Sequence, residues 1–185
     1  MKSNIFPAIK FTLATLVLFC GVYPAIVWAL ARLTPDSGKG EIIEAAGKRY
    51  YANVGQQFTS DKYFNGRPSA VDYNSASSAG SNKAMSNPEY LAMVQTRVDS
   101  FLVHNPAVNK TEIPVELVTA SGSGLDPDLS VKAALVQVKR VAKVRGLTEK
   151  QLRELVATHT QKPVLGFFGP EKVNVLSLNL ALDKL

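Results

Sequence analysis

The chain has 185 residues, of which 46% are hydrophobic and 19% are charged. Its formal net charge is +6, but Lys2, Lys10 and Arg32 flank one apolar segment, which leaves 18 of the 21 basic residues against 15 acidic ones. So mild an excess gives no indication of nucleic-acid binding. The single cysteine, Cys20, lies in the apolar segment, which excludes disulfides and cysteine-ligated metals from the rest of the chain.

Residues 11–31 form an uncharged run of 21 residues between Lys10 and Arg32. A helix needs about 20 apolar residues to cross the hydrocarbon of a bilayer, so the run predicts one membrane-spanning helix. No later segment is apolar enough to span again. We therefore divide the chain into a short tail (1–10), a transmembrane helix (11–33) and one soluble domain (34–185).

A cleavable signal peptide is the alternative interpretation of this run. Ala29, Leu30 and Ala31 resemble a signal cleavage site, but the apolar core of a signal has only about 7–15 residues. Trp28 and Arg32 near the end of the run are typical of a membrane–water interface. We favour a retained anchor.

Small residues recur every four positions within the predicted span. Gly21, Ala25 and Ala29 form a face on which another helix backbone can approach closely, although Gly and Ala are also common in such helices. Pro24 predicts a kink that frees a backbone carbonyl. We interpret Gly21, Ala25 and Ala29 as a docking face for a partner helix.

The charges around the span do not determine its orientation. Basic residues after the span outnumber those before it, which by count alone favours a cytoplasmic soluble domain. Long domains are translocated largely regardless of such charges, so both orientations stay open.

The first part of the soluble domain is poor in periodic segments. A polar link covers residues 34–40, and residues 41–54 suggest a short helix that passes into a strand through residues 49–51. The small residues at 75–82 predict a loop that flanking aromatics hold on the domain surface. Asn87 and Pro88 then begin a helix, which residues 105–106 end.

The second part alternates helices and strands. We predict a strand at 113–119, a helix from Ser130 to Gly146, a helix from Thr148 toward His159 and a strand at 163–168. Residues 173–182 alternate leucines with small or polar residues, which favours a strand over a buried helix. The predicted fold is a single N-terminal transmembrane helix followed by one mixed α/β (α+β) soluble domain.

The Gly/Ser loop at residues 121–124 is the only candidate cofactor site, and a weak one. Backbone N–H groups of Ser121, Gly122, Ser123 and Gly124 could cradle a phosphate between a strand and a helix. The loop lacks the Lys-Ser or Lys-Thr pair of a P-loop, and Pro127 occupies the third glycine position of a dinucleotide fingerprint. A conformationally demanding turn is the favoured interpretation.

Other chemically suggestive residues have structural explanations. Asp126 and Asp128 are expected to cap the helix that follows, and His104 and His159 to lie at helix ends, without metal. Arg67 is expected to fix its loop through a buried salt bridge rather than to bind an anion. Three lysines share one face of the 130–146 helix and indicate a solvated surface, with an acidic partner or anionic lipid as the alternative: Lys132, Lys139 and Lys143.

No catalytic constellation or metal site emerges, and the chain is expected to be a non-enzyme. A membrane-tethered hydrolase or nucleotide-binding protein that uses residues 121–124 is the first rival hypothesis. An anchored module for an anionic ligand, which uses Arg67 or the lysine row, is the second.

Taken in order, these segments resemble the C subunit of the Kdp-type potassium-transporting ATPase (the KdpC family). The likeness covers nearly the whole chain and rests on the following stretches: 55–58, 63–69 (YFNGRPS), 77–82, 118–129 (VTASGSGLDPDL), 137–142, 145–147, His159, 173–176 and 178–183. Two places depart: Lys172 replaces an expected arginine, which loses bidentate geometry, and residues 41–54 do not match.

The resemblance implies an accessory subunit of a high-affinity, ATP-driven potassium importer in the bacterial inner membrane. Its implied partners are a potassium-channel-like subunit, a P-type ATPase subunit that hydrolyses ATP, and a small single-span subunit. The C subunit is described as assisting assembly and as a catalytic chaperone that raises the ATPase subunit's affinity for ATP, so ATP is expected only in concert with that subunit. The resemblance also implies a cytoplasmic N-terminus and an extracytoplasmic soluble domain.

Overall fold

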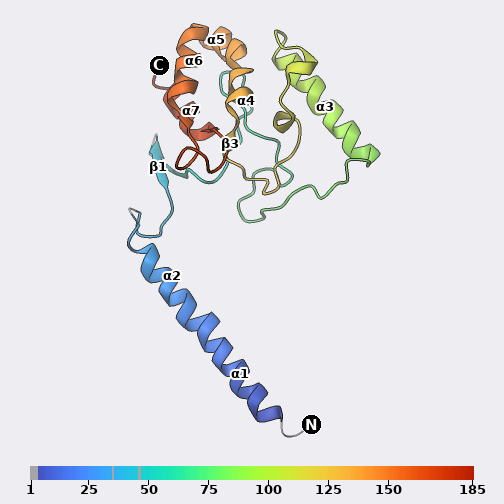
Figure 1. The fold of residues 1–185 in the computed structure, drawn as a ribbon. Coiled ribbons are helices and arrows are strands. Elements are labelled where there is room, and N and C mark those ends of the chain that lie inside the picture. The colour runs from blue at the N-terminus through green and yellow to red at the C-terminus, as the bar shows by residue number, and fades with distance from the viewer. Residues whose placement is uncertain (1–3, 35, 46) are drawn as a thin grey trace. The chain divides into compact units, whose positions relative to one another are not determined.

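The computed structural model describes residues 4–34, 36–45 and 47–185. The chain separates into two compact units, residues 1–43 and residues 44–185, and each is described by itself. The first holds a long apolar helix and the second holds helices with small sheets, which confirms the predicted fold class (Figure 1).

The N-terminal unit contains one continuous helical run, Ile5–Ala31, of 27 residues with a mean hydropathy of 2.1. It consists of α1 (Ile5–Val17), a π-helical turn (Leu18–Val22) and α2 (Tyr23–Ala31), and it buries no residue. Its length and composition are those of a membrane span, although it begins earlier than residue 11. The disturbance predicted at Pro24 takes the form of the π-helical turn just before it, which accommodates the missing proline N–H.

A two-stranded sheet follows, made of β1 (Ile42–Ala45) and β2 (Lys48–Tyr51). The strand expected at 49–51 is confirmed, whereas the short helix expected before it is wrong. Gly47, with φ +73°, lies in the turn between the two strands, a conformation that suits glycine. Irregular backbone then runs to α3 (Pro88–His104), whose first turn is capped by the Asn87 side chain as predicted.

The strand expected at 113–119 is wrong. Two short 3₁₀ turns lie here instead, Lys110–Glu112 and Val115–Leu117, and the backbone bonds are local. The expected helix from Ser130 to Gly146 is two helices, α4 (Val131–Leu135) and α5 (Val138–Arg145). Its ends are as predicted, because the Ser130 side chain caps α4 and Gly146 adopts the left-handed conformation after α5.

The predicted third helix is confirmed as α6 (Glu149–Thr158), with a complete capping box between Thr148 and Gln151. A three-stranded antiparallel sheet has the order β3-β5-β4, from β3 (Asp128–Leu129), β4 (Thr160–Gln161) and β5 (Lys172–Asn174).

Two strand predictions near the C-terminus are wrong. Residues 175–182 form a helix, α7 (Val175–Leu182). Its buried positions are 175, 176, 178, 179 and 182, a helical spacing that the alternating leucines concealed, because Asn179 is buried and Leu180 is only half-buried. Residues 163–168 form an exposed loop that contains only an isolated bridge between Val164 and Phe168.

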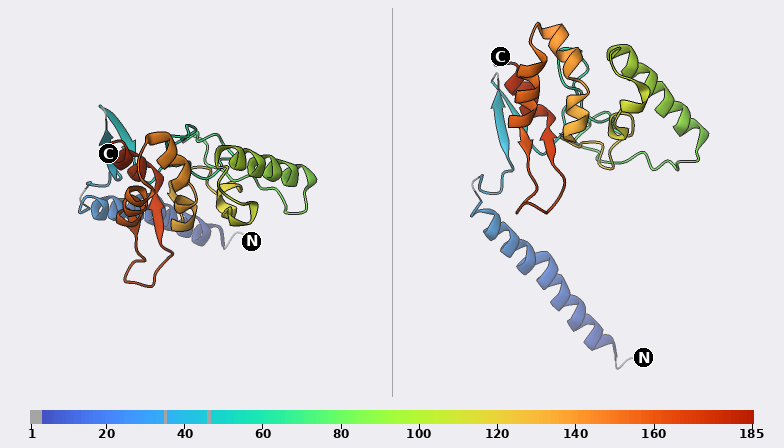
Figure 2. Two further views of the ribbon diagram at one scale, coloured as in Figure 1. Left: turned by 90° about the horizontal axis from the view of Figure 1, so that it is seen from above. Right: turned by 45° about the horizontal axis from the view of Figure 1, so that its top comes forward.

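The core of the second unit has two clusters. The larger surrounds Phe64, which is fully buried among apolar side chains of α4, α5, α6, α7 and β5. The smaller joins Leu117, Leu129, Ala133 and Val175. All views show α3 to one side of the group α4–α7 (Figures 1 and 2). The segment that carries Phe64 therefore lies within the main core although it has no regular secondary structure.

Candidate functional site

The segment 61–65 is held by side chains of α7 and of the residues between α4 and α5. Asn179 accepts from the Phe64 N–H and donates to the Phe64 carbonyl, both at 2.9 Å. Gln137 accepts from the Asn65 N–H at 2.9 Å and donates to the Asn65 carbonyl at 3.1 Å. Both side-chain amides are buried. Each binds the N–H and the carbonyl of one residue of irregular backbone, as a neighbouring strand would do in a sheet.

Arg140 completes this network from α5. Its buried guanidinium donates to five oxygens at 2.6–3.0 Å: Asn105 Oδ1, the Asp61 and Tyr63 carbonyls, Asn65 Oδ1 and Gln137 Oε1. The Asp61 carboxylate lies 3.6 Å from Nη1. Burial lowers the pKa of Arg140 and Asp61 opposes that shift, while a guanidinium stays charged at any physiological pH.

Several polar groups of the predicted Gly/Ser loop are engaged within the protein. Ser121 is buried; its N–H donates to the Pro68 carbonyl and its Oγ accepts from the Gly124 N–H at 2.9 Å. The Ser123 Oγ accepts from the Leu125 N–H, and the Ser78 hydroxyl donates to the Ser123 carbonyl. Two of the loop's four N–H groups, those of Ser121 and Gly124, are thus committed to protein acceptors, as is the N–H of Leu125 just after the loop, which favours the structural turn over a phosphate cradle.

The glycines of this loop pack against the segment 69–80. Gly124 has φ +69°, and a Cβ there would lie 2.6 Å from Val71 Cγ2 and 2.8 Å from the Ala79 carbonyl oxygen. A Cβ on Gly80 would approach the Gly122 carbonyl oxygen to 3.1 Å. The small residues therefore serve close backbone packing between two distant segments.

Arg67 forms the expected salt bridge, with Nη1 2.9 Å from Asp126 Oδ2 and both side chains mostly buried. Its Nε is buried without a hydrogen-bond partner, and the Tyr73 hydroxyl donates to its carbonyl. Burial raises the pKa of Tyr73, Asp126 raises it further and Arg67 opposes the rise.

The capping role expected of the two aspartates is wrong. Asp126 accepts from the Asp128 N–H and pairs with Arg67, while Asp128 lies 2.6 Å from the Lys172 ammonium. Ser130 alone supplies the side-chain cap described for α4. Both aspartates instead form ion pairs with residues of distant segments, and the spacing of residues along the sequence does not predict such pairs.

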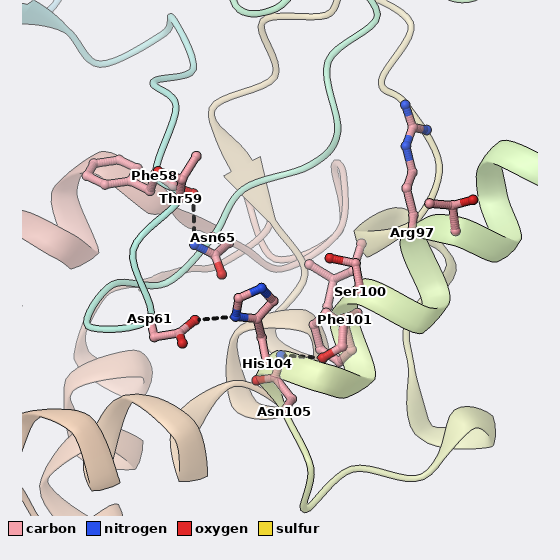
Figure 3. Close-up of a pocket in the computed structure, with 11 residues that line it drawn as sticks. Phe58, Thr59, Asp61, Asn65, Arg97, Ser100, Phe101, His104 and Asn105 are labelled. Carbon is pink, nitrogen blue, oxygen red and sulfur yellow. Dashed lines mark hydrogen bonds and ion pairs between the residues drawn. The ribbon is translucent and has the colours of Figure 1, made fainter.

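A pocket of about 450 Å³ separates α3 from the segment 58–65 (Figure 3). His104, the last residue of α3, and Asp61 both line it and contact each other, with Nδ1 2.9 Å from Oδ1. His104 lies at a helix end as predicted, whereas its carboxylate partner was not predicted. Within the described residues, no group of three or more His, Cys, Asp or Glu side chains could hold a metal ion.

The remaining predicted residues lie on exposed surface, except for the half-buried His159. Ala25 and Ala29 are one turn apart on α2, and Gly21 lies in the π-helical turn, where an added Cβ would meet no atom within 4 Å. The lysine row is solvent-exposed as expected: Lys132, Lys139 and Lys143. His159 follows α6, and its Nδ1 lies 2.9 Å from the Leu155 carbonyl oxygen.

The residues that sequence reasoning missed are Gln137, Arg140 and Asn179. Each is a polar residue in or next to a helix whose neighbours are buried, and that interruption of an apolar stripe was the available signal. The backbone groups that they bind in the segment 61–65 lie 72 or more positions away, so these roles require the tertiary structure.

Comparison with known proteins confirms the family that the order of the motifs indicated. The sequence profile described as K+-transporting ATPase, c chain (KdpC) matches residues 5–184. The potassium-transporting ATPase KdpC subunits of Flavobacterium psychrophilum and Bacteroides thetaiotaomicron are 52% and 50% identical, each over 98% of both chains. That of Caldanaerobacter subterraneus is 48% identical over 98% of this chain and 95% of its own. The apolar helix, the segment 61–65 and the Gly/Ser loop all lie within these matches, and the chain belongs to the KdpC family of K+-transporting ATPase c chains.

Proposed function

We propose that this chain is the non-catalytic accessory subunit of an ATP-driven potassium uptake complex. The observation that carries the proposal is the match of the family over residues 5–184, which includes both the apolar helix and the whole second unit. The relatives are named as subunits of a potassium-transporting ATPase. Because subunits assemble, the partners are the channel-like, P-type ATPase and small single-span subunits of the same complex.

ATP hydrolysis belongs, in this proposal, to the P-type ATPase subunit. The most distinctive polar groups of the chain are engaged internally. Arg140 is bound by five oxygens, and the N–H groups of Ser121 and Gly124 in the loop, and of Leu125 after it, have protein acceptors. The chain then raises the ATPase subunit's affinity for ATP through assembly, as a catalytic chaperone, and not through a phosphate loop of its own.

Assembly in the membrane uses the helix face of Gly21, Ala25 and Ala29. The open space beside Gly21 supports this part of the proposal, since a partner backbone can approach there without displacing any side chain of this chain. Helix association in lipid depends on such close packing, so larger side chains on this face should separate the subunits.

Purification of the complex from mild detergent tests the proposal. The tagged chain, expressed with its partner subunits, should retain them together with potassium-stimulated ATPase activity, and omitting the chain should lower activity and raise the KM for ATP. The double variant Gly21→Leu/Ala25→Leu should lose the partners. Val22→Leu/Ile26→Leu, one position along the helix and on another exposed face, is the matched control and should retain them.

ATPase activity of the purified chain alone, or full activity of the partners without it, would contradict the accessory role. Loss of the partners in both double variants would leave the accessory role intact and remove the assignment of the Gly21 face.

A further inference from the structure

The loop between β4 and β5 exposes a contiguous apolar surface. Residues 163–170 (PVLGFFGP) carry no charge, and we call them the apolar tip. Four large side chains are mostly exposed: Val164 by 68%, Leu165 by 78%, Phe167 by 70% and Phe168 by 59%. Figure 2 shows the tip as a loop that projects from the second unit. A cluster of this kind marks an interaction site, because isolated domains rarely leave contiguous apolar patches in water.

The backbone of the apolar tip is largely closed on itself. Val164 and Phe168 exchange both N–H···O bonds, at 3.0 and 2.9 Å, and the Gly166 and Phe167 N–H groups donate to the Pro163 and Val164 carbonyls. The two phenyl rings also pack together, with centroids 4.2 Å apart. Backbone groups that enter a medium without water need internal partners, and this tip already supplies four of its donors with them.

The chain enters the second unit beside the strand that carries the tip. Asn174, at the end of β5, donates to the Ala52 carbonyl at 2.7 Å. Only residues 32–41 separate the apolar helix from β1, and ten extended residues reach roughly 35 Å at most. A helix that spans a bilayer therefore tethers the second unit to that bilayer through a short linker, which raises the effective concentration of the tip toward lipid.

We propose that the apolar tip inserts into the headgroup–acyl boundary of the bilayer that the N-terminal helix spans. The proposal depends on the retained anchor of the proposed function. Lipid is the occupant that the observations favour, because the tip offers apolar and aromatic side chains without any charged group to orient a protein partner. Lys162 and Glu171 stand at its rim, where headgroups and water are available. The tip is then a second membrane contact that limits rotation of the domain about its linker.

A single indole reports the position of the tip. In the full-length chain carrying Trp28→Phe, which removes the only tryptophan, Phe167→Trp places an indole in the tip. Val115→Trp is the matched control, because Val115 is 71% exposed on a 3₁₀ turn elsewhere in the domain. Both chains are reconstituted in phosphatidylcholine vesicles with and without bromine on the acyl chains, which quenches only indoles that reach the hydrocarbon boundary.

We expect the indole at position 167 to be quenched at least about twofold more than the one at position 115, with a blue-shifted emission. Phe168→Trp is a second reporter in case one substitution disturbs the loop, and thermal unfolding of each variant checks the fold. Equal quenching at positions 167 and 115 would overturn the proposal. So would an indole that is shielded only after the partner subunits are added, since that result assigns the tip to a protein contact.

Alkaline carbonate washing of the same vesicles separates the two proposals. If the chain stays on the vesicles but the indole in the tip is not quenched, only the tip contact is rejected. Chain that washes off rejects the anchor and, with it, the tether on which the tip contact depends.

Discussion

At the scale of single residues, irregular backbone in this chain is stabilised by buried side chains that take the place of a strand. Asn179 and Gln137 each bind both backbone polar groups of one residue in the segment 61–65, and Arg140 binds two further carbonyls there. A buried carbonyl without a partner is costly, so these three side chains explain how the segment places Phe64 in the core without a sheet.

Arg140→Met should therefore lower the free energy of unfolding by about 3–5 kcal/mol, because it leaves several buried oxygens without a donor. Arg140→Lys should cost less, since it keeps the charge and part of the bonding. Urea unfolding of the full chain in mild detergent, followed by circular dichroism, measures both. Arg153→Met on the exposed face of α6 is the control, with a loss below about 0.5 kcal/mol. A similar loss in both methionine variants would contradict the network.

Tyr73 gives the second prediction at this scale. Burial raises the pKa of its phenol above that of an unfolded tyrosine, about 10. Its contribution to stability is therefore complete below the unfolded pKa and is lost as pH rises through the folded pKa. We expect Tyr73→Phe to be less stable at pH 8 by about 1 kcal/mol, because the Arg67 carbonyl loses its donor, and to lose stability less steeply above pH ~10.

Unfolding measured from pH 8 to 11 checks this, with the exposed Tyr51→Phe as control. Some alkaline loss should persist in Tyr73→Phe, since the hydrogen bond to Asp183 also raises the pKa of Tyr63. Parallel pH profiles for wild type and Tyr73→Phe would contradict the assignment.

At the scale of elements, the two glycines of the Gly/Ser loop differ in whether the structure leaves space for a side chain. Gly124→Ala should destabilise by about 2–4 kcal/mol, because its positive φ disfavours a Cβ that would also collide with Val71 and the Ala79 carbonyl. Gly122→Ala, two residues away, meets no atom within 4 Å and should change stability by less than about 1 kcal/mol. Thermal unfolding compares them directly. Equal losses would contradict the turn, and loss of ATPase function in folded Gly122→Ala would revive a ligand role for the loop.

Local signals predicted the ends of elements well, and tertiary context decided the rest. The caps at Asn87, Ser130 and Thr148 and the stop at Gly146 follow from side chains within one turn. The break between α4 and α5 could not be predicted in this way, because Gln137 at the break binds a segment 72 residues earlier in the sequence. Residues 175–182 were mistaken for a strand because the leucines alternate along the sequence, whereas burial follows the helical spacing 175, 176, 178, 179 and 182 and includes the polar Asn179.

At the scale of the whole molecule, the family and its motifs could be recognised in the sequence, but the contacts that the motifs make with each other could not be predicted. The Gly/Ser loop and the Arg67 motif were recognised as unusual, but only the structure shows that they pack together, through Ser121 on Pro68 and Arg67 on Asp126. The same holds for His104 and Asp61, which lie 43 positions apart in the sequence and form an ion pair in the lining of one pocket. Contacts between distant segments have no signature in residue spacing.

The side of the membrane on which residues 34–185 lie is the remaining question at this scale, and charge counting and the family resemblance favour opposite answers. Cysteine labelling decides it: in a Cys20→Ala background, Lys150→Cys places one thiol on exposed α6 and Asn4→Cys places one before the span. An extracytoplasmic domain predicts that an impermeant maleimide labels position 150 in intact spheroplasts and position 4 only after permeabilisation. The reverse pattern would show that the basic residues after Ala31 stay inside, as the positive-inside rule expects, and would place the domain beside the ATP pool.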